Sequence, residues 1–292
     1  MFRATNNFKV IEFQTVSFCN SNCIVCPWHL LKKTAKLRYL SDDLWQKLLK
    51  ELAQIKPQRV IPYLNNEPLL DDNIFDRIGM IKSILPNCTM EISTNGSLLN
   101  SEKIDALLNG QVDDILLSIF GHNETSEKAL MSQNFSYNKI VEHVIELHKK
   151  NQKLAKRHNI AVIKIDNSPF IKEEDIEDNI SFWKKHGIKV LRYGFLNRAG
   201  NIKTKGERNP LITPKGCELN RHNERIYMYV DGFITFCCHD WKKMYKMGDF
   251  NHQSLSEVWN SAKYKNLRLQ VEGEKRSTND FLCRKCKLCL EK

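Results

Sequence analysis

The stretch that decides the fold of this chain is Cys19-Asn20-Ser21-Asn22-Cys23-Ile24-Val25-Cys26, which follows an apolar run at residues 8–16 (FKVIEFQTV). Three thiolates at CxxxCxxC spacing can hold three irons of an iron–sulfur cube and leave the fourth iron without a protein ligand. A structural zinc site is the alternative, although zinc usually takes four ligands in paired CxxC or Cys/His patterns. No fourth ligand lies inside the loop, but His29 is near enough in the sequence that a zinc site stays an alternative.

The composition is that of a globular protein. The chain has 292 residues, of which 41% are hydrophobic and 27% are charged. No stretch approaches the roughly 20 apolar residues of a membrane span, and the N-terminus lacks the apolar core of a secretory signal. We therefore expect a cytoplasmic protein without a membrane partner. In that reducing compartment, ten cysteines grouped toward the two ends of the chain favour metal ligation over disulfides.

The net charge of +11 raises the question of a nucleic-acid partner. The lysines are spread along the expected helices rather than gathered in one tract. A solvated, lysine-rich surface explains this distribution better, so we expect no nucleic-acid partner.

Strand-like and helix-like segments alternate through the first 200 residues. Amphipathic helices are expected after Ser41, over 73–84, after Ser101, over 137–148 and over 173–186. Expected strands cover residues 8–16, 59–64, 90–93, 114–119, 160–165 and 189–195. This order predicts an α/β fold whose parallel strands form a closed or partly closed (β/α)6 barrel, similar to a TIM barrel.

In such barrels the active site lies at the C-terminal ends of the strands. The cysteine loop, Asn65-Asn66-Glu67, Thr94-Asn95-Gly96 and Ser118 all fall at or just after strand ends. We expect them to share one rim.

The last third of the chain predicts a small second domain. Residues 197–216 are typical of a linker, so the expected domains are 1–200 and 201–292. A β-hairpin is expected over 226–236 with its turn at Asp231-Gly232, followed by Cys237-Cys238-His239-Asp240 and a helix opened by the capping box Ser254–Glu257. The chain closes on Cys283-Arg284-Lys285-Cys286-Lys287-Leu288-Cys289.

With its cysteine loop after the first strand of a six-unit barrel, the chain resembles the radical S-adenosylmethionine (SAM) enzymes over essentially its whole length. The resemblance implies that Cys19, Cys23 and Cys26 hold a [4Fe–4S] cluster whose open iron binds SAM. An electron, delivered by a reductant such as flavodoxin or ferredoxin, then cleaves SAM to a 5′-deoxyadenosyl radical that takes hydrogen from a substrate carbon.

The same resemblance implies a set of SAM contacts. Asn65-Asn66-Glu67-Pro68 stands where the family usually has Gly-Gly-Glu-Pro, and asparagine tolerates the backbone angles of that loop better than most residues. Further candidates are Ser93, Asn95 and Ser118, for which ordinary turn and strand-end hydrogen bonding is the alternative. Val25 replaces the family's aromatic residue near the adenine, and Trp28 is its candidate substitute.

The tail resembles a SPASM domain in the truncated, single-cluster form called Twitch. The resemblance implies a second [4Fe–4S] cluster, with a zinc ribbon as the alternative; its ligands would be Cys217, Cys237, Cys283 and Cys286. Cys289 is either a spare thiol or a replacement for one of the four.

Four other residues of interest lie beside or apart from these groups. Cys88 is expected to be a small buried residue. Cys238 adjoins a ligand and is a candidate hydrogen-atom donor to a substrate radical, unless it packs behind the hairpin. His239 and Asp240 are candidate acids or bases, unless they cap the hairpin.

For the reaction, resemblance to single-cluster relatives predicts hydrogen abstraction from a sugar, an aminocyclitol or an aminoglycoside. Dehydrogenation or epimerisation would follow, and Cys238 tilts the expectation toward epimerisation. Arg192 and Arg198 are candidate substrate contacts. A peptide maturase is the alternative, although a first strand near Phe8 leaves no room for an N-terminal peptide-recognition domain. A cysteine-rich nucleic-acid-binding module is a remote third hypothesis.

Overall fold

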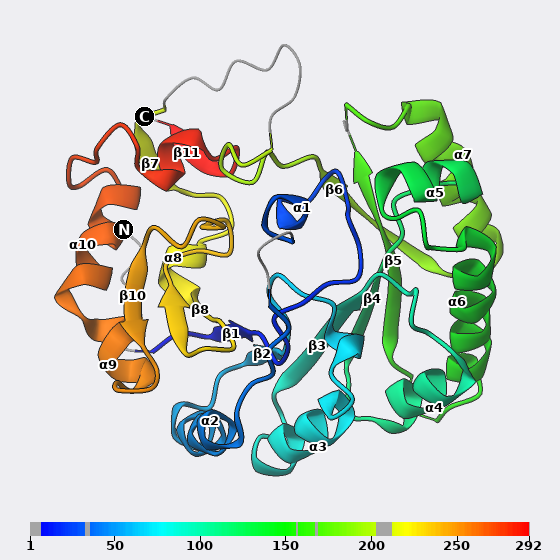
Figure 1. The fold of residues 1–292 in the computed structure, drawn as a ribbon, viewed down its shortest axis with the longest axis horizontal. Coiled ribbons are helices and arrows are strands. Elements are labelled where there is room, and N and C mark those ends of the chain that lie inside the picture. The colour runs from blue at the N-terminus through cyan, green and yellow to red at the C-terminus, as the bar shows by residue number, and fades with distance from the viewer. Residues whose placement is uncertain (1–6, 33–35, 156, 167–168, 203–211, 292) are drawn as a thin grey trace.

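The computed structural model describes residues 7–32, 36–155, 157–166, 169–202 and 212–291. One nine-stranded sheet organises the molecule, in the order β10-β9-β8-β1-β2-β3-β4-β5-β6. In Figure 1 this sheet crosses the molecule from the C-terminal hairpin, through β1 to β3, to β4 and β5. The barrel-forming strands and the C-terminal cysteine domain therefore share one hydrogen-bonded sheet.

The first six strands are all parallel to their neighbours, which confirms the predicted partial (β/α)6 barrel. Within the described residues β6 pairs only with β5, so the barrel is open at this edge. The first two strands are shorter than expected. The strands are β1 (Val10–Phe13), β2 (Arg59–Ile61), β3 (Thr89–Thr94), β4 (Asp114–Ser118), β5 (Asn159–Asp166) and β6 (Lys189–Gly194).

Helices connect consecutive strands and lie on the outside of the sheet (Figure 1). They are α2 (Asp42–Ile55), α3 (Ile74–Ile84), α4 (Ser101–Asn109), α5 (Glu124–Leu130), α6 (Tyr137–Gln152) and α7 (Glu173–Lys185). Ser41 caps α2 as predicted, because its side chain accepts from the Leu44 N–H. The cap of α4 is Asn100 rather than Ser101, since the Asn100 side chain accepts from the Lys103 N–H.

Side chains of the strands alternate between the two faces of the sheet. On β3, Met90 and Ile92 are fully buried in the apolar core, whereas Glu91 and Ser93 are partly exposed on the other face. On β1, Ile11 and Phe13 are fully buried, and the Phe13 ring contacts the Trp45 ring of α2. The apolar face is thus covered by helices, and the other face is left for polar side chains.

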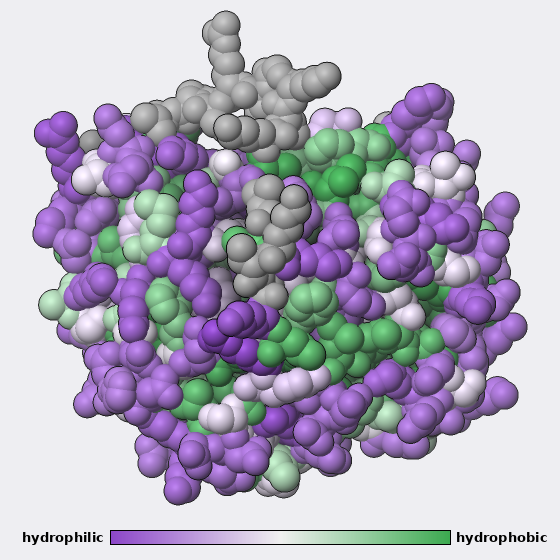
Figure 2. Space-filling view, in the orientation of Figure 1, coloured by the Kyte–Doolittle hydropathy of each residue, from purple (hydrophilic) through white to green (hydrophobic). Residues whose placement is uncertain are grey.

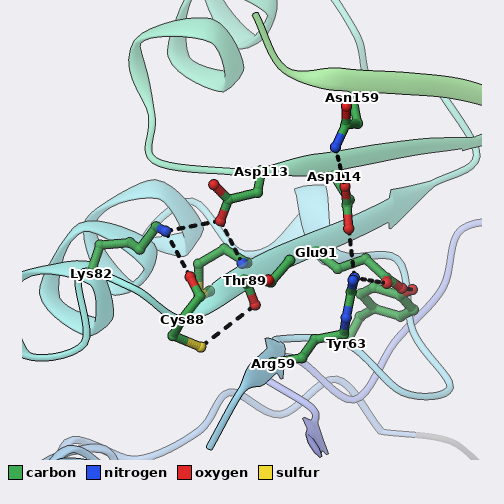
Figure 3. A network of polar contacts seen from close by, with 10 residues as sticks. Arg59, Tyr63, Lys82, Cys88, Thr89, Glu91, Asp113, Asp114 and Asn159 are labelled. Atoms are coloured by element: carbon green, nitrogen blue, oxygen red, sulfur yellow. Dashed lines mark hydrogen bonds and ion pairs between the residues drawn. The ribbon is translucent and has the colours of Figure 1, made fainter. Parts of the chain in front are cut away.

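A polar network crosses that second face at the N-terminal ends of the strands (Figure 3). The Arg59 guanidinium contacts Glu91 at 2.7 Å and Asp114 at 2.6 Å, and Asn159 donates to Asp114 at 2.9 Å. The Tyr63 hydroxyl donates to Glu91. Because Arg59, Asp114 and Asn159 begin β2, β4 and β5, the network closes the end of the barrel opposite the predicted rim.

Cys88 lies at the edge of this region and apart from the other cysteines. It is 5% exposed, and its thiol faces the Thr89 carbonyl at 3.6 Å. The prediction of a buried residue is confirmed.

The C-terminal part continues the same sheet. The predicted hairpin is present, with a left-handed Gly232 (φ +81°) at its turn. Its first strand pairs in parallel with β1, so that Tyr227 lies opposite Glu12. The elements are β7 (Pro214–Cys217), α8 (Arg221–Glu224), β8 (Arg225–Met228), β9 (Phe233–Thr235), β10 (Lys246–Asp249), α9 (Leu255–Asn260), α10 (Ala262–Val271), η2 (Leu282–Lys285) and β11 (Cys289–Glu291).

Two further expectations concern this part. The Ser254–Glu257 capping box is confirmed at the start of α9. The predicted linker, 197–216, falls in part on residues 203–211, which lie outside the described residues. Its last three residues were predicted wrongly, because from Pro214 the chain forms β7, which pairs with β11.

The face of the molecule drawn in Figure 2 is mostly hydrophilic. Figure 2 shows polar side chains over most of one face, with apolar side chains gathered in a band across its middle. Among the helices described, none is both long and apolar enough to cross a membrane.

Candidate active site between two groups of cysteines

The first cysteine loop lies between the end of β1 and α1 (Trp28–Leu31). Hydrogen bonds from the Asn22 and Ile24 N–H groups to carbonyls of Met131 and Leu130 fasten it to the end of α5. Cys23 is buried and its sulfur lies 2.9 Å from the Ser21 hydroxyl. All ten cysteines lie in the described part of the chain and are free thiols, which agrees with ligation rather than disulfide formation.

The surroundings of these thiols fit an iron–sulfur cluster. Burial raises the pKa of Cys19 to about 12, and it also raises the pKa values of Cys23 and Cys26. The three thiols lie close enough that the charge of Cys26 raises the pKa of each of the other two. Thiolates in such a place need compensating positive charge, which the irons of a cluster provide.

No three His, Cys, Asp or Glu side chains of the described residues are grouped closely enough to hold a single metal ion. An iron–sulfur cube binds each thiolate through a different iron, so its ligands stand further apart than those of one zinc ion.

Glu67 ties the rim together. Its N–H donates to the Phe18 carbonyl at 3.0 Å, beside the cysteine loop. Its carboxylate accepts from the Thr94 hydroxyl at 2.7 Å and from the Asn95 N–H at 2.9 Å. Burial raises the pKa of Glu67 to about 6. The loop after β2 is thereby fixed to both the cysteine loop and the end of β3, as expected for a shared rim.

The other predicted SAM contacts lie on the same rim. Asn95 donates to the Asn20 side chain in the cysteine loop at 2.8 Å. The Ser93 and Ser118 hydroxyls are 3.2 Å apart across β3 and β4. Asn65 donates to the Tyr229 hydroxyl at 3.1 Å, so this loop also contacts the C-terminal hairpin.

Asn66 has unused hydrogen-bonding capacity. Its side-chain oxygen accepts from the Leu64 N–H at 2.9 Å, which sets the orientation of the amide. Its Nδ2 is buried and has no partner among the described residues. A ligand acceptor, such as a carboxylate, would satisfy this donor.

Trp28 holds the cysteine loop in place. Its indole N–H donates to the Cys19 carbonyl at 3.0 Å, and its ring meets the Phe18 ring edge-on, with centroids 5.5 Å apart. Val25 is 2% exposed. Packing of Trp28 on the adenine stays a prediction.

The C-terminal cysteines gather where β7 and β11 meet. The antiparallel pairing of these strands sets Cys289 opposite Cys217. Turn hydrogen bonds link Cys283 to Cys286 and Cys286 to Cys289. Burial raises the pKa of Cys283, and the charges of Cys286, Cys289 and Cys217 raise it further. Cys289 thus lies beside three of the four predicted ligands, and its role as a ligand or spare thiol stays open.

Cys237 and Cys238 approach this group from the end of the hairpin. The His239 N–H lies 3.5 Å from the Cys237 sulfur, and the His239 ring lies 3.7 Å from the Cys286 sulfur. The interaction between the two neighbouring thiols raises the pKa of Cys237 and lowers that of Cys238. The charge of Arg221 lowers both.

Three residues beside Cys238 have no counterpart in the sequence-based predictions. Glu12, Tyr227 and Arg221 all interact electrostatically with the Cys238 thiol. Burial, and then the charge of Cys238, raise the pKa of Glu12 to about 7, although Arg225 pairs with it at 2.7 Å. One signal was available: Glu12 is the single charged residue in β1.

The candidate substrate arginines differ in position. Arg192 bonds Asp166 at 2.7 Å and Glu177 on α7, so it joins the end of β5 to this helix. Arg198 lies 3.5 Å from the His239 ring, and its charge acts on the buried Cys26 thiol. Arg198 therefore contacts the histidine beside the C-terminal cysteines and also acts electrostatically on a thiol of the first loop.

Asp240 caps the hairpin. Its carboxylate accepts from the Thr235 hydroxyl and the Tyr245 N–H, both at 2.8 Å. Of the two roles considered for Asp240, an acid or base and a cap of the hairpin, the structure contains the cap.

Comparison with known proteins agrees with both parts. The family model of the radical SAM superfamily matches residues 13–183, more than half of the chain, and that of the SPASM iron–sulfur cluster-binding domain matches residues 217–289. A curated protein of Niallia circulans, S-adenosyl-L-methionine-dependent 2-deoxy-scyllo-inosamine dehydrogenase, is 21% identical over 280 residues, covering 96% of this chain and 92% of its own.

Two solved structures share the fold. BtrN in complex with AdoMet and 2-DOIA has a TM-score of 0.63 at 18% identity, covering 96% of this chain and 93% of its own. Streptococcus suis SuiB bound to its precursor peptide SuiA has a TM-score of 0.73 at 13% identity, covering 98% of this chain and 71% of its own. From its barrel, its cysteine loop and the family match, this chain belongs to the radical SAM superfamily.

Proposed function

We propose that this radical SAM enzyme carries a second [4Fe–4S] cluster on Cys217, Cys237, Cys283 and Cys286, and that it dehydrogenates a secondary alcohol of an aminocyclitol-like small molecule. The observation that carries the proposal is the position of Arg198, which lies 3.5 Å from the His239 ring in the C-terminal group and acts electrostatically on Cys26 in the first loop. Glu12 on β1, Tyr227 on β8 and Arg221 on α8 all interact electrostatically with Cys238. Cys238 follows the hairpin whose first strand pairs with β1. A radical made at one group can therefore act close to an electron acceptor at the other.

The side chains near Cys238 suit a substrate rich in hydroxyl and amino groups. The Glu12 carboxylate accepts hydrogen bonds from such groups, and the Arg221 guanidinium donates to hydroxyl oxygens. The Tyr227 hydroxyl and the Arg221 Nε are buried and have no partner among the described residues. A polar ligand would satisfy both atoms, whereas an apolar one would leave them unpaired.

The chemistry balances as a two-electron oxidation. When bound, the first cluster and SAM supply a 5′-deoxyadenosyl radical that takes one hydrogen atom, and the second cluster can accept one electron. Glu12 receives the hydroxyl proton, for which a pKa of about 7 is suitable near neutral pH. The alcohol becomes a ketone, and 5′-deoxyadenosine carries away the abstracted hydrogen.

The relative from Niallia circulans supports dehydrogenation over epimerisation, because that protein is a dehydrogenase and the two chains match over nearly their full lengths. The interaction with Cys237 lowers the pKa of the Cys238 thiol. Epimerisation would require Cys238 to return a hydrogen atom to the substrate radical.

The test uses anaerobically reconstituted protein, SAM, a strong reductant and 2-deoxy-scyllo-inosamine deuterated at the carbinol carbon. We expect a ketone and one deuterium in each 5′-deoxyadenosine, in Cys238→Ala as well as in the wild type. In deuterated water, a product that carries one solvent deuterium, and that is no longer formed by Cys238→Ala, would show epimerisation. Full cluster loading with no 5′-deoxyadenosine from any aminocyclitol, but with modification of a peptide, would overturn the proposal in favour of a peptide maturase.

A further inference from the structure

His239 lies between the C-terminal cysteines and two arginines. The side chain is 1% exposed. Its Nδ1 is 3.7 Å from the Cys286 sulfur, while its Nε2 is 3.3 Å from the Arg221 guanidinium and 3.5 Å from that of Arg198. Its backbone N–H lies 3.5 Å from the Cys237 sulfur. One residue thus contacts the sulfur atoms of two proposed ligands.

The arginines determine which ring nitrogen of His239 carries the proton. A guanidinium can only donate hydrogen bonds, so Nε2 must accept. In a neutral imidazole the proton then belongs to Nδ1, the nitrogen that faces Cys286. The Asn201 side chain donates to the His239 carbonyl at 3.1 Å and holds the residue in this orientation.

We propose that His239, held by Arg198 and Arg221, raises the reduction potential of the C-terminal iron–sulfur cluster by donating hydrogen bonds to its sulfur ligands. Hydrogen bonds to the sulfurs and positive charge nearby both stabilise the reduced, more negative cluster. The inference deepens the proposed function, on which it rests, because a cluster with a higher potential accepts the substrate's electron more readily.

The first cysteine loop differs in having a carboxylate among its charged neighbours. Among the charged groups that act on Cys19, the Glu67 carboxylate has the largest effect on its pKa, larger than that of Lys32. The C-terminal group instead has Arg221 beside Cys237 and Cys238. Arg198 acts on Cys26 as well as on His239, so the difference between the two clusters rests on Glu67 at the first and on Arg221 at the second. This difference favours electron donation by the first cluster and acceptance by the second.

The test is a potentiometric titration of the fully loaded protein, followed by electron paramagnetic resonance. In His239→Ala we expect one of the two clusters to become harder to reduce, by about tenfold in the ratio of reduced to oxidised cluster at a fixed potential, or about 59 mV for one electron. The other cluster should not change. His239→Asn, which retains a side-chain N–H donor, should recover part of the shift.

Arg198→Gln gives a second measurement that leaves His239 and all the thiols in place, and we expect a smaller shift in the same direction. His222→Ala is the matched control, because His222 is equally buried in the same domain but its ring contacts Glu272 and Asn223. Its potentials should equal those of the wild type.

Two results would overturn the inference. The first is an unchanged potential in His239→Ala with full iron content, which would leave the two-cluster proposal intact. The second is a wild-type protein that binds only about four irons per chain, since without a second cluster the proposed function fails as well. The iron content therefore tells the two failures apart.

Discussion

The carboxylate of Glu67 accepts a hydrogen bond from the backbone N–H of Asn95 at 2.9 Å, although the two residues are 28 positions apart. The same carboxylate accepts from Thr94 and from the Leu69 N–H. Since Asn95 in turn bonds Asn20, a continuous chain of contacts joins β2, β3 and the cysteine loop. The rim behaves as one unit because a single buried carboxylate serves all three donors.

Replacing Glu67 should therefore damage both stability and SAM binding. Glu67→Ala leaves three donors without an acceptor, and we expect the free energy of unfolding to fall by about 3 kcal/mol. Glu67→Gln retains one acceptor oxygen and should lose less. Anaerobic urea unfolding and equilibrium dialysis with SAM measure the two effects; unchanged values for both in Glu67→Ala would contradict this role.

The cysteines should divide into two independent groups. Reconstituted wild-type protein should bind about eight irons per chain, and the variant with Ala at positions 19, 23 and 26 should bind about four. Cys88→Ala is the control, because this thiol is buried apart from both groups. Stoichiometric zinc in colourless protein would show that the cysteine groups are zinc sites.

The role of Cys289 can be tested in the same way. If Cys217, Cys237, Cys283 and Cys286 are the four ligands, Cys289→Ser should retain about eight irons per chain, whereas Cys283→Ser should lose about four. The reverse result would make Cys289 a ligand. Iron analysis, together with the visible absorbance of the cluster, distinguishes the two outcomes.

The Arg59 network should stabilise the closed end of the barrel (Figure 3). Arg59→Met leaves the partly buried Glu91 and Asp114 carboxylates without their cation, and we expect a loss of about 2 kcal/mol. The exposed pair of Lys150 with Asp105 provides a control, since Lys150→Ala should change the free energy of unfolding far less than Arg59→Met does. Equal effects in urea unfolding would show that burial adds nothing to the network.

Glu12 should make stability depend on pH. Because its pKa is raised to about 7 in the folded protein, its contribution to stability is fully present below pH 4.5 and is lost as the pH rises through 7. The uncharged Glu12→Gln should therefore gain on the wild type with rising pH, by about 3 kcal/mol between pH 4.5 and pH 8. Parallel unfolding series that stay equally far apart at every pH would contradict the raised pKa.

Much of the barrel was predictable because its signals are local. The alternation on β3, the cap at Ser41 and the turn at Gly232 each depend on a few neighbouring residues. The exact cap of α4 was wrong because Asn100 and Ser101 are both good caps and only the backbone geometry selects one. The fold class and the first cysteine group needed no tertiary information.

The active-site constellation depended on tertiary structure. Glu12 and Tyr227 lie opposite each other only because β8 pairs with β1, and the Lys9–Glu224 ion pair beside this junction joins residues 215 positions apart. His239 likewise meets Cys286 and Arg198 from separate elements. The sequence by itself determined the strands, the helices and the cysteine spacings, because these depend on neighbouring residues. The tertiary structure decided which distant strands pair, and with them which charges surround the thiols, because pairing between remote segments leaves no periodic signal in either one.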